Sequence, residues 1–309
     1  METTRLAGRR IWAWLGIALL LVGAASACGG SSPVAASGPI KVVAGQNFWG
    51  SLANQLGGSR ASVQSVVTDP NADPHEYASN TNDARAFADA GFVILNGAGY
   101  DDWASKLLSA NPSSHRTVLV AAELLGKKAG DNPHFWYNPD YVTRMADQII
   151  ADYKAIDTAD AGYFDQQRAA FTTALKPYSQ RIAEIKAKFS GAPIGATESL
   201  FVYMAAALGL NLISPTEFMN AVAEGNDPPA SAVIDFQNQI TGKQVKVLIY
   251  NVQTATAVTT NIKHLAALAD IPVVGVSETL QPESATFQDW QLSQLLALEN
   301  ALNASALAA

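Results

Sequence analysis

The stretch Asp160–Ser190 decides the fold of this chain, and it reads DAGYFDQQRAAFTTALKPYSQRIAEIKAKFS. Its apolar residues recur at steps of three and four, which is typical of one face of an α-helix. About 30 residues at 1.5 Å each would span roughly 45 Å, more than most globular helices. Gly191 and Pro193 follow as helix-stop residues, whereas Pro177 lies inside and is expected to kink or split the helix. Segments of similar length lie on both sides, so we expect a long helix that joins two lobes.

Strand and helix signals alternate on both sides of this helix. Before it, short apolar runs separated by helical segments lie at 41–44, 61–67, 92–95 and 117–121. After it the same rhythm returns, and Val245–Tyr250 (VKVLIY) is the clearest strand of the chain. This alternation indicates parallel sheets covered by helices. We therefore predict an α/β fold of two lobes, each a mainly parallel sheet flanked by helices, joined by one long helix.

Size and charge limit the class of protein. The 309 residues, 49% of them hydrophobic, suit two domains with cores of their own. The formal net charge is −7 and no basic patch is present, which argues against nucleic-acid binding.

The first residues have the pattern of a secretory signal. Arg5, Arg9 and Arg10 precede an apolar run at 11–22 that is too short for a comfortable membrane span. Small residues then lead to Cys28, and this arrangement resembles a bacterial lipoprotein box, in which the cysteine is lipidated. Cys28 is the only cysteine, so it cannot form an internal disulfide. A plain signal peptide with an incidental cysteine is the alternative.

Two of the four histidines follow a proline in a loop. His75 ends an Asp-Pro-His motif and His134 an Asn-Pro-His motif, each after a strand region, where open α/β sheets bind ligands. The proline restricts the backbone ahead of each ring. His115 and His264 lie in a polar connection and on a helix surface, and we expect neither to be a ligand. On local features alone, His75 and His134 could also be unrelated surface residues.

Three segments carry a resemblance to a known family. They are 73–77 (DPHEY), 132–136 (NPHFW) and 195–198 (GATE). Their order resembles that of the bacterial zinc- and manganese-uptake receptors, the solute-binding lipoproteins of metal ABC transporters (cluster A-I), and the resemblance covers 40–302. It implies four metal ligands, which are His75, His134, Glu198 and Glu278. Glu278 departs from the family pattern, where this position is usually aspartate.

The chemistry of this set suits a divalent transition metal. Two imidazoles and two carboxylates give four ligands and balance the charge of the ion. Oxygen ligands suit manganese, whereas the Irving–Williams order favours zinc. The loop at 126–132 (GKKAGDN) lacks the histidine-rich insertion of some zinc receptors. The sequence is compatible with either metal as the ligand, and a sheltered four-ligand site slightly favours zinc.

The resemblance implies a receptor and not an enzyme. The expected protein is extracytoplasmic, lipid-anchored to the bacterial cell membrane and monomeric. It would bind one Zn²⁺ or Mn²⁺ ion as transported ligand and deliver it to the membrane permease of an ABC transporter. We expect a signal peptide at 1–27, lipidated Cys28 with a flexible tether at 28–38, an N-terminal metal-binding lobe at 39–157, a connecting helix at 158–190 and a C-terminal metal-binding lobe at 191–309.

Two other functions deserve a test. A secreted metallohydrolase would keep an open metal position and a base such as Glu76, but no HExxH motif and no GxSxG elbow is present. A sugar or peptide receptor on a two-lobe scaffold could stack its ligand on Trp136, although paired Pro-His loops would serve no purpose there.

Overall fold

The computed structural model describes residues 38–307. The predicted signal peptide and the predicted lipidation at Cys28 lie outside these residues. Within the described range, every helix is too short or too polar to pass through a membrane.

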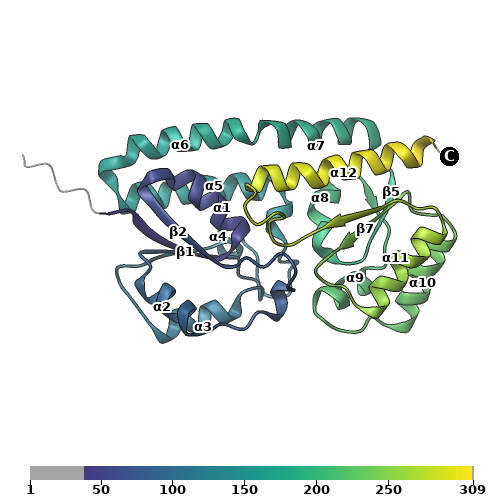
Figure 1. Ribbon diagram of the computed structural model, residues 1–309, viewed down its shortest axis with the longest axis horizontal. Coiled ribbons are helices and arrows are strands. Elements are labelled where there is room, and N and C mark those ends of the chain that lie inside the picture. The colour runs from purple at the N-terminus through teal and green to yellow at the C-terminus, as the bar shows by residue number, and fades with distance from the viewer. Residues whose placement is uncertain (1–37, 308–309) are drawn as a thin grey trace, which may run out of the picture. The chain divides into compact units, whose positions relative to one another are not determined.

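The first sheet has four parallel strands in the order β2-β1-β3-β4. Their bounds are β1 (Ile40–Gln46), β2 (Ala61–Val67), β3 (Phe92–Leu95) and β4 (Thr117–Val120). All four residues of β3 are buried, as its unbroken apolar sequence FVIL predicts for a strand covered on both faces. The helices that accompany this sheet are α1 (Asn47–Gly57), α2 (Thr81–Asp89), α3 (Asp102–Ala110), α4 (Ala121–Leu125) and α5 (Pro139–Ile156) (Figure 1).

The second sheet repeats this topology. Its order is β6-β5-β7-β8, again with all strands parallel. The strands are β5 (Pro193–Ala196), β6 (Asn211–Leu212), β7 (Val247–Asn251) and β8 (Val273–Val276). The accompanying helices are α8 (Val202–Ala207), α9 (Thr216–Ala223), α10 (Ala230–Thr241) and α11 (Ala257–Leu268). The predicted fold class, two parallel sheets flanked by helices, is therefore confirmed.

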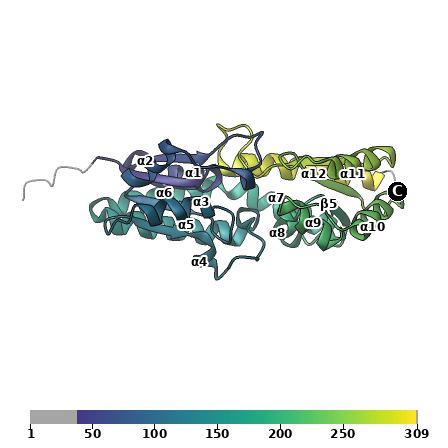
Figure 2. The same cartoon turned by 90° about the horizontal axis from the view of Figure 1, so that it is seen from below.

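The long linking helix is present and is split in two. Its parts are α6 (Ala161–Ala174) and α7 (Lys176–Phe189), with Pro177 in the first turn of α7. Proline has no N–H to donate to the preceding turn and its ring crowds that turn, which explains the break. Leu175 keeps right-handed helical angles, so the two parts continue end to end (Figures 1 and 2). The predicted apolar stripe is buried at Phe164, Phe171, Tyr178 and Ile185.

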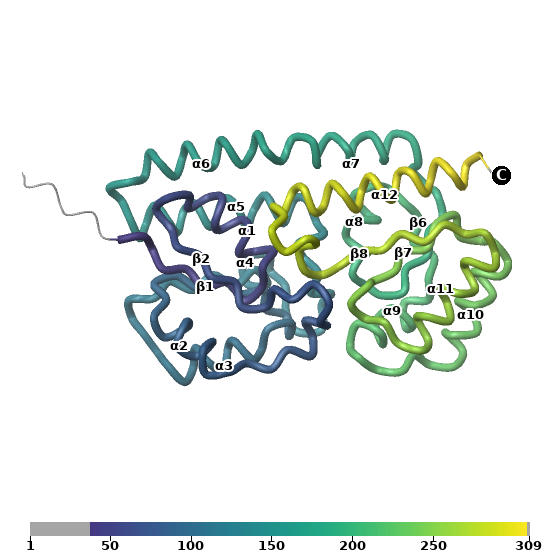
Figure 3. Tube along the Cα trace, in the orientation of Figure 1, coloured from purple at the N-terminus to yellow at the C-terminus, as the bar shows by residue number. Residues whose placement is uncertain are grey.

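A second connection between the two sheets was not predicted. After β8 the chain runs to the first sheet, where Leu280 N–H donates to Asn47 Oδ1 at 3.2 Å and Phe287 N–H donates to Ser51 Oγ at 3.0 Å (Figure 3). Helix α12 (Phe287–Leu307) then returns and packs against α7. The segment 277–288, which we call the return segment, therefore ties both halves together near the site.

Candidate metal centre

Three of the four predicted ligands lie on loops that follow a parallel strand, and the fourth, His134, lies on the loop after α4, which itself follows β4. His75 lies in a short 3-10 helix (Pro74–Glu76) after β2, and His134 precedes another (Phe135–Tyr137) after α4. Glu198 follows β5 and Glu278 follows β8. Because the carboxyl ends of parallel strands share one edge of a sheet, these loops meet where open α/β sheets bind ligands.

The structure brings all four side chains together. One nitrogen or oxygen atom from each lies within 4.8 Å of the others. Glu278 Oε2 lies 3.2 Å from His75 Nε2 and 3.6 Å from His134 Nε2. Glu198 Oε1 lies 3.3 Å from His134 Nε2. Glu278, the least certain of the four from the sequence, is thus as central as the others.

Burial separates these side chains from the remaining histidines. The side chains of His134, Glu198 and Glu278 are at most 1% exposed, whereas that of His75 is 20% exposed. His115 and His264 are exposed and lie outside the cluster, in agreement with their expected surface positions.

Three atoms at the centre have no hydrogen-bond partner among the described residues. They are His75 Nε2, His134 Nε2 and Glu198 Oε1, and all three are buried. A buried polar atom left without a partner costs about 1–3 kcal/mol. Three such atoms facing one point therefore fit a bound cation, which would accept a lone pair from each of them.

The Asn132 side chain sets the orientation of the His134 ring. Asn132 Oδ1 lies 2.8 Å from His134 Nδ1 and also accepts from the His134 N–H at 3.0 Å. Its amide nitrogen donates to Ser199 O at 2.7 Å, so the amide oxygen must face the ring. With Nδ1 as the donor, Nε2 is the nitrogen that can bind a metal.

Sequence reasoning missed three side chains that hold the carboxylates. Tyr100 donates to Glu278 Oε2 at 2.7 Å. The Asn251 amide donates to both Glu198 Oε2 and Glu278 Oε1, and Thr254 donates to Glu198 Oε2. Asn251 is the last residue of β7, and Tyr100 lies in the loop between β3 and α3. Both are therefore near strand ends, a signal that could have pointed to them.

Charges in the cluster shift its protonation. Burial lowers the pKa of His75, but the nearby charges of Glu278 and Glu198 outweigh burial and raise this pKa to about 9. For His134, burial again lowers the pKa, but the same two carboxyl groups close to its Nε2 atom outweigh burial and raise the pKa. Burial opposes ionisation of Glu278, but the two imidazoles outweigh it and hold the pKa of this carboxyl well below its ordinary value. The carboxylates thus favour protonated imidazoles at the point where a divalent ion would balance their charge.

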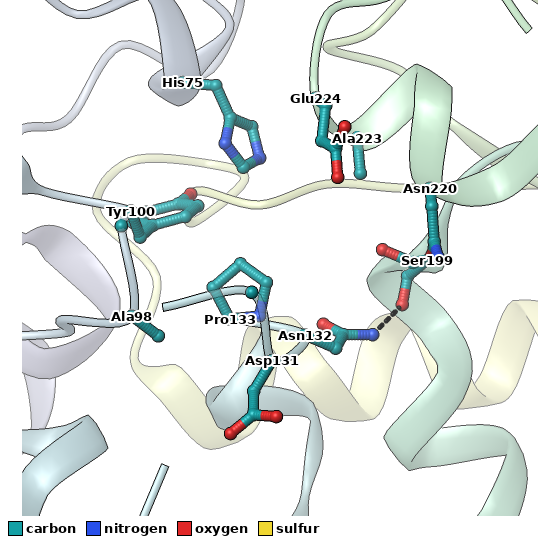
Figure 4. Close-up of a pocket in the computed structure, with 12 residues that line it drawn as sticks. His75, Ala98, Tyr100, Asp131, Asn132, Pro133, Ser199, Asn220, Ala223 and Glu224 are labelled. Atoms are coloured by element: carbon teal, nitrogen blue, oxygen red, sulfur yellow. Dashed lines mark hydrogen bonds between the residues drawn. The ribbon is translucent and has the colours of Figure 1, made fainter. Parts of the chain in front are cut away.

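A cleft reaches the site from one side. Its volume is about 450 Å³, and His75 is the only predicted ligand in its lining. His75 and Tyr100 line it from the first half of the chain and Ser199 and Glu224 from the second (Figure 4). The cleft therefore gives an ion from solution a route to the exposed edge of the His75 ring.

The known proteins that this chain resembles are named for metal uptake or metal transport. Residues 42–301 match the family model described as "zinc-uptake complex component A periplasmic". The metal ABC transporter substrate-binding lipoprotein FimA of Streptococcus parasanguinis is 27% identical over 206 residues, which are 60% of this chain and 64% of FimA. The manganese ABC transporter substrate-binding lipoprotein PsaA of Streptococcus pneumoniae is 27% identical over 213 residues, which are 62% of this chain and 66% of PsaA. The chain thus spans slightly less than two thirds of these relatives.

Solved structures share the fold. The crystal structure of ZnuA superposes with a TM-score of 0.65 at 20% identity, covering 87% of this chain and 98% of ZnuA. At this identity the likeness concerns the fold, including the linking helix and the paired parallel sheets.

Proposed function

Because the chain belongs to the zinc-uptake component A family of periplasmic solute-binding proteins, we propose that it is a receptor that binds one divalent metal ion and delivers it to the permease of an ABC transporter. The family consists of solute-binding proteins and not of enzymes, in agreement with the expectation from the sequence.

One observation carries the proposal: the convergence of His75, His134, Glu198 and Glu278 on a single buried point. Each half of the chain supplies two of these ligands, one from each of two strand-end loops. An ion at this point would replace the protons that otherwise balance the carboxylates, and it would tie the lobes at 39–157 and 191–309 together. The absence of an HExxH motif and of a GxSxG elbow leaves a hydrolase without its usual base or nucleophile.

The cargo is zinc or manganese. The family model is described by zinc uptake, whereas the name of the PsaA relative specifies manganese. Two imidazoles and two carboxylates accept either ion.

The place of action follows from the N-terminal pattern and the relatives. We propose lipidation of Cys28 after removal of residues 1–27, with 28–38 as the tether. Both relatives are named as lipoproteins. A lipid-anchored monomer would keep the folded part beside a permease in the same membrane.

Metal analysis tests the proposal. The chain from Gly38 onward is purified, its bound zinc and manganese are measured, and the measurement is repeated with His134→Ala. We expect about one ion per chain in the parent and little in the variant. His264→Ala changes an exposed histidine outside the cluster and should bind like the parent. A metal-free parent that binds a sugar or peptide tightly, or one that hydrolyses a substrate with its metal, would contradict the proposal.

A further inference from the structure

One carboxylate oxygen of Glu198, Oε2, already accepts two hydrogen bonds. Asn251 Nδ2 donates to Glu198 Oε2, and Thr254 Oγ1 donates to the same oxygen at 2.9 Å. A carboxylate oxygen offers two lone pairs, and these two donors use both. The other oxygen, Oε1, faces His134 and has no hydrogen-bond partner among the described residues. Glu198 therefore presents one free oxygen to the centre of the site.

The position of Asn251 is fixed by its neighbours. Its side-chain oxygen accepts from the backbone N–H of Gln253 at 3.0 Å, so its amide nitrogen must face the carboxylates. The same nitrogen donates to Glu278 Oε1 at 2.8 Å. Asn251 is 2% exposed, and it lies at the end of β7, between the strands that precede Glu198 and Glu278. One rigid amide thus holds an oxygen of each carboxylate.

We propose that Asn251 and Thr254 restrict Glu198 to one metal-binding oxygen and thereby favour zinc over manganese at this site. This inference rests on the proposed function of the four ligands. Zinc is satisfied by four ligands, and one atom from each of the four side chains supplies that number. Manganese favours sites with more oxygen ligands, and a carboxylate that binds through both oxygens is a common source of the extra one.

Burial decides where a further ligand can come from. The side chains of Glu198 and Glu278 are at most 1% exposed, and His75 is the only one of the four ligands that lines the cleft. A fifth ligand must therefore be the second oxygen of a carboxylate or a water that enters past His75. For Glu198 to supply it, the carboxylate has to give up a hydrogen bond to Asn251 or Thr254, and a charge-assisted hydrogen bond changes an equilibrium about tenfold or more.

Competition binding on the full chain tests this proposal. The dissociation constants of Zn²⁺ and Mn²⁺ are measured for the wild type, Asn251→Ala and Thr254→Val. We expect the ratio of the manganese constant to the zinc constant to fall about tenfold in each variant, because Glu198 Oε2 loses one of its two donors. Asn251→Ala also releases Glu278 Oε1, so Thr254→Val isolates the effect of Glu198. Thr254→Ser keeps the hydroxyl and should restore the wild-type ratio. Thr260→Val, the same change at an exposed position of α11, should leave the ratio unchanged.

X-ray absorption counts the metal's neighbours directly, and its measurement on the wild type needs no variant. Zinc in the wild type should have four nitrogen or oxygen neighbours, and manganese in Asn251→Ala should gain one relative to manganese in the wild type. A five-coordinate zinc in the wild type, or variants that bind metal with an unchanged ratio and coordination number, would overturn the inference while the receptor function stands. A wild type that binds no metal would instead refute the proposed function itself.

Discussion

Metal binding should displace protons, and the number displaced follows from the structure. The pKa of His75 is raised to about 9 by Glu278 and Glu198, against the effect of burial. At pH 7, below this value, we expect His75 of the metal-free protein to be mostly protonated. The raised pKa of His134 adds up to one more proton. Since a metal needs the lone pair on each Nε2 atom, we expect one to two protons released per ion at pH 7.

This proton count sets the pH dependence of affinity. Each displaced proton makes the association constant rise about tenfold per pH unit, so the affinity should increase about 10- to 100-fold from pH 7 to pH 8. The increase should level off above about pH 9, where His75 is neutral in the free protein. The affinity is accordingly lost as the pH falls, because the imidazoles bind protons in place of the ion.

Calorimetry in buffers of different ionisation enthalpy measures the protons released directly. His75→Ala should release about one proton fewer than the wild type, and His115→Ala, at an exposed position outside the cluster, should release the same number. Fewer than about half a proton released at pH 7, together with an affinity that does not change between pH 7 and pH 9, would refute the reasoning.

Three further predictions follow from the same contacts. The raised pKa of His75 stabilises the metal-free fold fully below its unfolded value of about 6.5, and this contribution is lost as the pH rises through about 9. The melting temperature of the metal-free protein should therefore fall between pH 6.5 and 9, and a rise would contradict the assignment. Asn132→Ala removes the acceptor that orients His134, so metal titration should show about 10- to 100-fold weaker binding. Asn82→Ala changes an exposed asparagine and serves as the control. An equal loss of metal affinity in this control would point to a general effect on folding and contradict the prediction. Scattering with and without metal should differ little, because α6–α7 and the return segment both join the halves; a large domain rotation would contradict this.

The sequence determined the features that depend on neighbouring residues. Hydrophobic periodicity predicted the strands and the linking helix, and the missing N–H of Pro177 predicted the break in that helix. The Pro-His motifs and the strand-end rule selected His75 and His134, and the family resemblance added Glu198 and Glu278. The structure brings all four side chains together. The eight-residue helix α9 was missed, because a short segment gives too few turns for a clear period.

Only the tertiary structure decided how the site is held. The chain alone does not tell that the return segment crosses to the first sheet and carries Glu278 to within 2.7 Å of the Tyr100 hydroxyl. Nor does it tell that the Asn251 amide lies between two carboxylates that are 53 and 27 residues away in sequence. The physical reason is that periodicity and turn signals are local, whereas the hydrogen bonds that orient ligands join residues whose distance is set by strand order. The residue types of the site were therefore predictable, but the free oxygen of Glu198 was not.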